Sequence, residues 1–276
     1  MNLANLMPQL RGERRPIKFL ASRLLWRTGA CRLLSIPRNG YRIRFYPTSI
    51  SAALWLNPQD LTHDETVLSQ FIRPGDTVVD VGANIGTLTL HAASRVGPSG
   101  SVHSFEANPR TYQFLRGNVR LNRLDNTARV HGCALGDAPG LLSFTGGRWD
   151  DMAHISENGE IKVEVRRLDD VLGHLPSVSV LKIDVEGFEI PVLRGAKDLL
   201  RKTELLYVES FEPQLRRYGF STAELISVLT DAGFSLYRRS NGKWHSVSQD
   251  HVSSTCENLL GVSLGARERV AGIMAA

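Results

Sequence analysis

Cysteines, long apolar runs and a phosphate-binding signature are scarce or missing in this 276-residue sequence. Its three cysteines, Cys31, Cys133 and Cys256, are odd in number and far apart, so we expect no disulfide framework, cysteine metal site or redox pair. No apolar run reaches the roughly 18 residues of a membrane-spanning helix. A Gly-Lys-Ser or Gly-Lys-Thr sequence is absent, which excludes a P-loop. The first residues also lack the pattern of a secretory signal, and we therefore expect a cytoplasmic protein.

Positive charge is concentrated near the N-terminus. The chain has 33 Lys and Arg residues against 28 Asp and Glu residues, a net charge of +5. Residues 1–50 contain ten of the basic residues and one of the acids, a net charge of +9, which leaves −4 for residues 51–276. Because the larger part is mildly acidic, we predict no nucleic-acid partner.

Residues 17–36 have apolar residues near helical spacing with arginines between them, which predicts a basic amphipathic helix interrupted around Thr28 and Gly29. Two interpretations stay open. The helix packs on the domain with a solvated basic face, or residues 1–44 contact an acidic substrate or an anionic membrane at its inner face. We therefore divide the chain into a basic amphipathic extension, residues 1–50, and a catalytic domain, residues 51–276. The sequence predicts no oligomeric state.

Strand and helix patterns alternate regularly from about residue 65 onward. Helices are predicted over residues 65–72, 85–94, 110–121, 191–200 and 221–232. Strands are predicted over residues 77–82, 101–107, 128–135, 141–145, 161–168, 179–187, 204–210, 234–239 and 258–264. This alternation favours right-handed βαβ units. We expect an α/β fold with a mostly parallel sheet and helices on both faces.

A glycine-containing loop between a predicted strand and helix is the strongest functional signal. It contains Asp80, Gly82, Asn84 and Gly86. Ligands of such sheets bind where strands end, and glycines allow close approach to the backbone. A dinucleotide loop needs a middle glycine where this chain has Asn84, which disfavours a nicotinamide dehydrogenase. An acid at Asp80 would repel phosphates but suits the cationic end of S-adenosylmethionine.

Glu106 is the second signal, at the end of the next predicted strand and 20 residues after Gly86. A carboxylate at this position accepts hydrogen bonds from both ribose hydroxyls in nucleotide-binding sheets. The pair of signals predicts an adenosine-containing cofactor.

Several segments resemble the FkbM family of S-adenosylmethionine-dependent methyltransferases over about residues 50–265. They are VVDVGANIGTLTLHAA, GSVHSFEANP, NVRLN, CALGD and, most specifically, LKIDVEGFEIPVLRGA. The resemblance implies a seven-stranded, Rossmann-like methyltransferase fold. It also implies an enzyme that methylates hydroxyls of sugars or polyketides. It also implies a cofactor site formed by Asp80, Gly82, Asn84, Gly86, Glu106, Asn108, Cys133 and Ala134, the last two near the adenine.

Four residues are candidates for catalysis. Asp184 and Glu186 follow a predicted strand and, by alternation, face the same side, while Glu209 ends the next strand. His154, in a polar loop, is a candidate because an unperturbed histidine side chain titrates near neutrality. Methyl transfer requires an aligned acceptor oxygen, exclusion of water and often removal of a proton, which suits Asp184. Asp184 and Glu209 would also suit Mg²⁺, but they form no recognisable ligand motif, so no metal is predicted.

The sequence thus predicts methyl transfer to a hydroxyl of a sugar or glycan, a glycolipid or a secondary metabolite. An N- or carboxyl methyltransferase with the same cofactor is one alternative, since acceptor pockets lie in variable loops. A cofactor-binding, membrane-associated module without catalysis is the other. The acids Asp184, Glu186 and Glu209 weigh against that module because binding alone does not need them.

Overall fold

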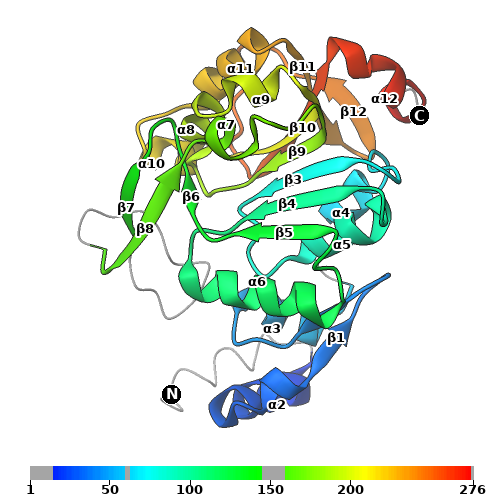
Figure 1. The fold of residues 1–276 in the computed structure, drawn as a ribbon, viewed down its shortest axis with the longest axis vertical. Helices are drawn as coiled ribbons and strands as arrows, with labels where there is room; N and C mark the ends of the chain where they lie inside the picture. Colours follow the sequence, from blue (N-terminus) through cyan, green and yellow to red (C-terminus); the bar gives the residue numbers. More distant parts are fainter. Residues whose placement is uncertain (1–14, 60–62, 145–158, 275–276) are drawn as a thin grey trace.

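The computed structural model describes residues 15–59, 63–144 and 159–274. Its centre is an eight-stranded sheet in the order β12-β11-β13-β10-β9-β3-β4-β5 (Figure 1). The five strands from β10 to β5 are parallel, whereas β13 is antiparallel to both of its neighbours. The strands are β3 (Thr77–Val81), β4 (Ser101–Phe105), β5 (Ala128–His131), β9 (Val178–Ile183), β10 (Thr203–Ser210), β11 (Phe234–Ser240), β12 (Lys243–Ser246) and β13 (Glu257–Ser263). The predicted α/β fold with a mostly parallel sheet is confirmed.

Helices cover both faces of the sheet, as predicted (Figure 1). Successive strand residues point to opposite faces, so Val78 joins one hydrophobic cluster and Val79 joins the other. The first cluster includes residues of α4 (His63–Leu68), α5 (Thr87–Val96), α6 (Pro109–Leu121) and α12 (Arg267–Met274). The second includes residues of α7 (Leu168–Leu172), α8 (Glu189–Arg194), α9 (Lys197–Leu200), α10 (Glu212–Arg217) and α11 (Thr222–Asp231).

The sheet has one strand more than the seven expected. All seven are present, and β12 adds an eighth at the edge through a hairpin with β11. Ser240 pairs with Lys243, so the hairpin turn consists of Asn241 and Gly242, with φ angles of 50° and 80°. Asn-Gly is the preferred sequence for such a two-residue turn. The sequence therefore contained a signal for β12 that our prediction did not use.

Two predicted elements are divided in the structure. The strand predicted over residues 128–135 ends as β5 at His131, opposite the last residue of β4, so a longer strand would have no partner there. The chain instead forms β6 (Ala134–Leu135) in a small sheet with β8 (Ile161–Arg166) and β7 (Gly140–Phe144). The helix predicted over residues 191–200 is broken at Gly195, where a Cβ would lie 2.0 Å from the carbonyl oxygen of Gly136.

The N-terminal segment shares the core of the domain. It contains α2 (Pro16–Thr28), a 3₁₀ helix (Ala30–Leu33), the antiparallel pair β1 (Ser35–Pro37) and β2 (Arg42–Arg44), and α3 (Ser49–Leu56). Ile36, Ile43 and Phe45 are buried in the same cluster as residues of α5. The predicted interruption at Gly29 is confirmed, with a φ of 75°. Among the described residues, no helix is long and apolar enough to span a membrane.

Candidate active site

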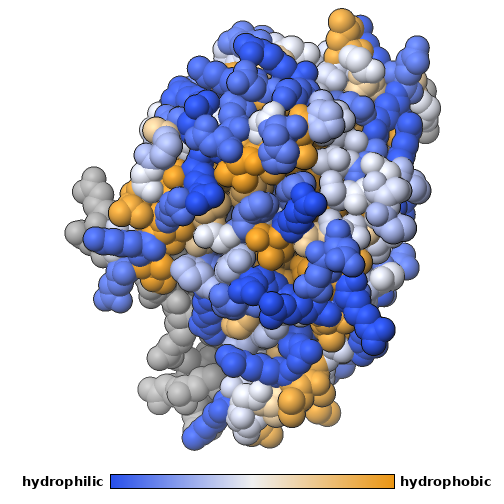
Figure 2. Space-filling view, viewed as in Figure 1, coloured by the Kyte–Doolittle hydropathy of each residue, from blue (hydrophilic) through white to orange (hydrophobic). Residues whose placement is uncertain are grey.

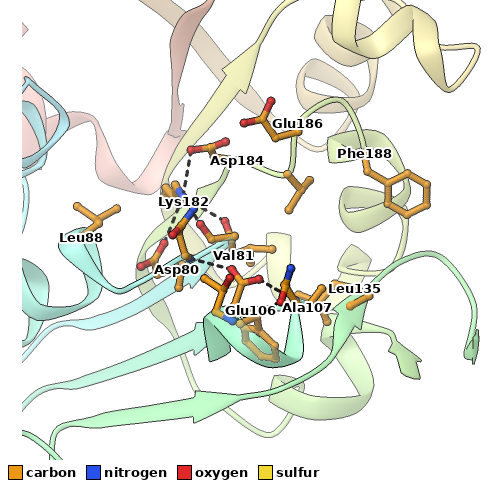
Figure 3. Close-up of a pocket in the computed structure, with 18 of the residues that line it drawn as sticks. Asp80, Val81, Leu88, Glu106, Ala107, Leu135, Lys182, Asp184, Glu186 and Phe188 are labelled. Atoms are coloured by element: carbon orange, nitrogen blue, oxygen red, sulfur yellow. Dashed lines mark hydrogen bonds and ion pairs between the residues drawn. The ribbon is translucent and has the colours of Figure 1, made fainter. Parts of the chain in front are cut away.

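A cavity of about 670 Å³ lies at the carboxyl ends of β3, β4 and β9 (Figure 3). This volume is within the usual range for small-molecule sites. The cavity brings together most of the predicted site residues, namely Asp80, Gly82, Asn84, Glu106, Asn108, Cys133, Ala134, Asp184 and Glu186. Gly86 and Glu209 are not among its lining residues, and His154 lies outside the described part of the chain.

The loop from β3 to α5 contains three residues whose backbones adopt the left-handed conformation. The φ angles are 76° at Gly82, 50° at Asn84 and 92° at Gly86, a conformation that asparagine tolerates better than most side chains do. A Cβ on Gly82 would lie 1.8 Å from the carbonyl oxygen of Asp184, so the two backbones touch here and only glycine fits. The predicted loop, which connects β3 to α5, therefore packs directly against the chain that follows β9.

Glu106 follows β4, and backbone groups hold its carboxylate at the cavity wall. Its Oε2 accepts from the amide of Asn84 at 2.9 Å, and its Oε1 accepts from the amide of Asn108 at 2.8 Å. Burial raises the pKa of Glu106 to about 7, although these two N–H groups act to lower it. The side chain of Asn108 caps α6 by accepting from the amides of Arg110 and Thr111. The orientation of Glu106 is therefore set before any ligand binds.

An apolar wall lies beside Glu106. Cys133 connects β5 to β6, and Ala134, Leu142 and Phe144 continue this surface. Burial raises the pKa of the Cys133 thiol to about 11, so it stays protonated at neutral pH. This wall suits a flat, uncharged ring such as adenine.

Lys182 lies at the centre of the polar part of the cavity and was not among the predicted site residues. Figure 3 shows its side chain between Asp80 and Asp184. Its Nζ lies 3.4 Å from Asp80 Oδ1 and 3.3 Å from Asp184 Oδ2, and it donates to the carbonyl of Gly82 at 3.0 Å. Burial lowers the pKa of Lys182, but the charges of Asp184 and Asp80 outweigh burial and raise it above its ordinary value. Lys182 is therefore a permanent cation.

Asp80 is fully buried, and its charge is already balanced. Its Oδ2 accepts from Thr89 Oγ1 at 2.6 Å, and Lys182 lies beside Oδ1. The contact predicted between Asp80 and the cationic end of the cofactor stays a prediction. What the structure shows is that Asp80 fixes Lys182 under the glycine loop.

Asp184 and Glu186 lie in a turn, because β9 ends at Ile183. The buried Glu189 holds this turn, since its Oε1 accepts from the amides of Val185 at 3.1 Å and Gly187 at 3.0 Å. Glu186 has a φ of 58°, and its exposed side chain accepts from Gln214. Strand alternation is not the reason for the place of Glu186, because β9 ends at Ile183 and the φ of Glu186 is positive. Both acids border the cavity, but only Asp184 contacts Lys182.

Glu209, at the end of β10, lies behind the lining of the cavity. Its Oε1 accepts from the thiol of Cys256 at 3.0 Å. Burial, followed by the charge of Asp184, raises the pKa of Glu209 to about 8. Burial therefore disfavours the ionised form of Glu209, and its role in catalysis stays a prediction. Within the described ranges, no group of three or more His, Cys, Asp and Glu side chains is placed to hold a metal ion.

A second polar wall was missed entirely by sequence reasoning. Asp64 of α4 and Asn258 of β13 both line the cavity. Asp64 Oδ1 accepts from Asn258 Nδ2 at 3.2 Å and from the hydroxyl of Tyr207 at 2.7 Å. Burial and then the charge of Asp64 raise the pKa of Tyr207 above its ordinary value, so the phenol remains a donor. No sequence signal connects residues that are this far apart.

When the sequence is compared with models of known protein families, one model matches a range that contains both the glycine loop and the turn with Asp184. A family model described as the methyltransferase FkbM domain matches residues 80–236. The chain belongs to this family. The matched FkbM range contains Glu106, Lys182 and Asp184, whereas Asp64 and Asn258 lie outside it.

Named relatives agree with the FkbM assignment. The chain is 28% identical to the hexuronic acid methyltransferase AglP of Haloferax volcanii, over 78% of this chain and 93% of AglP. It is 32% identical to the 31-O-demethyl-FK506 methyltransferase FkbM of Streptomyces tacrolimicus, over 60% of this chain and 75% of that protein. A third match, Methyltransferase 1 of Beauveria bassiana, is 32% identical over 45% of this chain and 60% of that protein. This chain is therefore an S-adenosylmethionine-dependent methyltransferase of the FkbM family.

Proposed function

We propose that this chain methylates a hydroxyl group of a sugar or glycan, a glycolipid or a secondary metabolite. The observation that supports this most is a single cavity with two chemically different ends. Glu106 and the apolar wall form one end, and the Lys182–Asp184 pair forms the other. The name of one relative refers to 31-O-demethyl-FK506, which supports a hydroxyl as the acceptor, and that of another refers to a hexuronic acid, which supports a sugar but carries both hydroxyls and a carboxylate. The acidic body of the chain supports an acceptor other than nucleic acid.

The residues at the first end fit S-adenosylmethionine. Glu106 has its oxygens oriented for ribose hydroxyls, and Gly82, which lines the cavity, lets the loop pack directly against the backbone of Asp184. Cys133 and Ala134 provide the apolar surface for the adenine. When bound, this cofactor supplies a methyl group on a sulfonium, which a nucleophilic oxygen accepts by direct displacement.

Asp184 is the residue best placed to act on the acceptor. Its side chain is 35% exposed and lines the cavity, and the ion pair with Lys182 at 3.3 Å holds it in place. We assign Asp184 as the general base that takes the hydroxyl proton while the acceptor oxygen gains the methyl group. The proton then passes to solvent. Lys182 is a positioning residue, since Asp80 and the carbonyl of Gly82 fix its ammonium group.

The remaining walls of this end suit a polar ring. Asp64 and Asn258 offer a carboxylate and an amide to further hydroxyls of the acceptor. Phe188 and Tyr218 also line the cavity, and their rings pack edge to face at 5.4 Å between centroids. Phe188 lies beside Gly136, on the side of the apolar wall.

Two experiments in sequence test the proposal. Calorimetric titration with S-adenosylmethionine and with NAD⁺ should show binding of the first alone, and folded protein that binds neither would contradict it. Transfer of a labelled methyl group is then measured on hydroxyl, amine and carboxylate acceptors. A methyl ether resists mild alkali, whereas a methyl ester releases labelled methanol. Label that is released by alkali, or found only on amines, would replace methylation of a hydroxyl by carboxyl or N-methylation, respectively.

A further inference from the structure

Helix α2 presents an apolar stripe on the side opposite to its packed face. Phe19 and Ser22 are buried against the domain. Ile17, Leu20 and Leu24 are 84%, 43% and 63% exposed. Their spacing of three and four residues places them on one side of the helix. A single exposed leucine is ordinary on a protein surface, but a continuous stripe marks an interaction site.

Exposed apolar side chains continue along the chain past the end of α2, and exposed arginines accompany them. Leu33 and Leu34 are 84% and 36% exposed, and Arg27 and Arg32 beside them are also exposed. Residues 15–44 contain no acidic side chain. Apolar and strongly hydrophilic residues adjoin at the end of the molecule where α2 lies (Figure 2). We call this the N-terminal surface, formed by Ile17, Leu20, Leu24, Arg27, Arg32, Leu33 and Leu34.

We propose that the N-terminal surface docks on a bilayer that contains anionic phospholipids. An amphipathic helix of this kind lies in the membrane plane, with apolar side chains among the acyl chains and arginines at the headgroups. Charge selects the lipid surface over a second copy of the chain. A symmetric dimer would bring the same surface of each copy together, so that arginines would face arginines with no acid between them.

The N-terminal surface is one helix away from the cavity. Trp55 of α3 donates from Nε1 to the carbonyl of Lys18 at 3.1 Å, and Lys18 Nζ lies 5.8 Å from the centre of the Trp55 ring. Ser49 and Ile50, at the start of α3, line the cavity. Docking through α2 therefore brings the cavity close to the membrane. On the function proposed above, this position suits an acceptor carried on a lipid.

Co-sedimentation of the full chain with vesicles tests the docking. The vesicles are phosphatidylcholine with and without phosphatidylglycerol, and no cofactor or acceptor is added. Replacing Ile17 and Leu24 together by Asp should weaken binding by on the order of tenfold for each side chain removed from the bilayer. Leu264→Asp is the matched control because Leu264 is 72% exposed outside the N-terminal surface. It should bind like the wild type.

The arginines are tested separately. Arg27→Gln and Arg32→Gln should each weaken binding to phosphatidylglycerol vesicles by about fivefold and leave binding to pure phosphatidylcholine unchanged. Added salt should abolish the difference. All variants should keep the melting temperature and the S-adenosylmethionine affinity of the wild type, measured without vesicles. A failure of docking is thereby distinguished from a failure of the proposed function, which that titration measures.

Three results would overturn the proposal. The Ile17 and Leu24 substitutions and the Leu264 control could bind vesicles equally. Wild-type protein could ignore vesicles and self-associate in sedimentation equilibrium, with the Ile17 and Leu24 substitutions restoring the monomer. Deletion of residues 1–14 could abolish vesicle binding while the Ile17 and Leu24 substitutions leave it intact. That result would assign the membrane contact to residues 1–14.

Discussion

The two ends of the cavity are built in different ways. The cofactor end comes from one stretch of chain, residues 80–144, and uses backbone amides to position Glu106. The acceptor end is assembled from α3, α4, the turn after β9 and β13. Its chemistry lies in side chains, chiefly the Lys182–Asp184 pair and Asp64. One continuous stretch of chain is enough to bind the cofactor, whereas the acceptor is bound by side chains from segments that are far apart in the sequence.

The two ends meet where the backbones of Gly82 and Asp184 approach closely. Lys182 reinforces this contact, because its ammonium group binds the carbonyl of Gly82 and pairs with Asp184. We therefore expect substitutions within one end to affect either the cofactor or the acceptor, and substitutions at the contact to affect both.

The largest effect is expected for Asp184→Asn. Loss of the general base should lower kcat by about 10²–10⁴-fold while changing the Kd for S-adenosylmethionine by only a few-fold. Glu186→Gln in the same turn is the control, because Glu186 contacts Gln214 and not Lys182. Steady-state kinetics and calorimetry measure both quantities. An equal loss of kcat in both variants would mean that Asp184 does not act as the base.

Gly82→Ala should break the contact between the two ends. The added Cβ would lie 1.8 Å from the carbonyl oxygen of Asp184, so the strand ends must separate. We expect a loss of about 3 kcal/mol in unfolding free energy, with weaker cofactor binding and a lower kcat. Gly97→Ala is the control because Gly97 also has a positive φ, of 66°, but has no atom within 4 Å of the added Cβ. It should lose only about 1 kcal/mol. Equal losses in urea denaturation would show that the close approach costs nothing.

Glu106 should make cofactor binding depend on pH. Burial raises its pKa to about 7 in the cofactor-free protein. Ribose hydroxyls donate to the ionised form, so binding lowers this pKa and releases a proton. Affinity should thus be full above pH 7 and about tenfold weaker at pH 6. Calorimetry in buffers of different ionisation enthalpy counts the released proton.

Two variants check that this pH dependence belongs to Glu106. Glu106→Gln should bind weakly and without the pH dependence. Glu164→Gln, which removes an exposed carboxylate on β8, should keep it. A Glu106→Gln variant that binds with unchanged affinity would remove Glu106 from the cofactor site.

The smallest effect is expected for Asp64→Asn. Asparagine can still accept from Tyr207 and Asn258, so the wall keeps its shape and loses only its charge. The KM for the acceptor should rise on the order of tenfold, with little change in kcat or cofactor affinity. Asp125→Asn, at an exposed acid, is the control. A fall in kcat with unchanged KM would contradict a role for Asp64 in acceptor binding.

The sequence by itself determined the class of fold, the glycine loop and Glu106. These features depend on periodicity and on a turn within a few residues, which are local properties of the chain. The position of Asp184 at the end of a strand was also predicted, but the turn that follows β9 was not, since residues 179–187 were predicted as one strand. The Asn-Gly hairpin of β12 was also readable, although our strand count omitted it.

Only the tertiary structure decided which charges meet. Lys182 is the one charged residue of the buried strand β9, and its role appears only when β3 places Asp80 beside it. Strand alternation is not the reason for the place of Glu186, because β9 ends at Ile183. The pairing of Asp64 with Asn258 joins residues 194 positions apart, and the exposed stripe of α2 is known only once the opposite face has packed. Such contacts are set by the packing of whole elements, and no local pattern of residues encodes them.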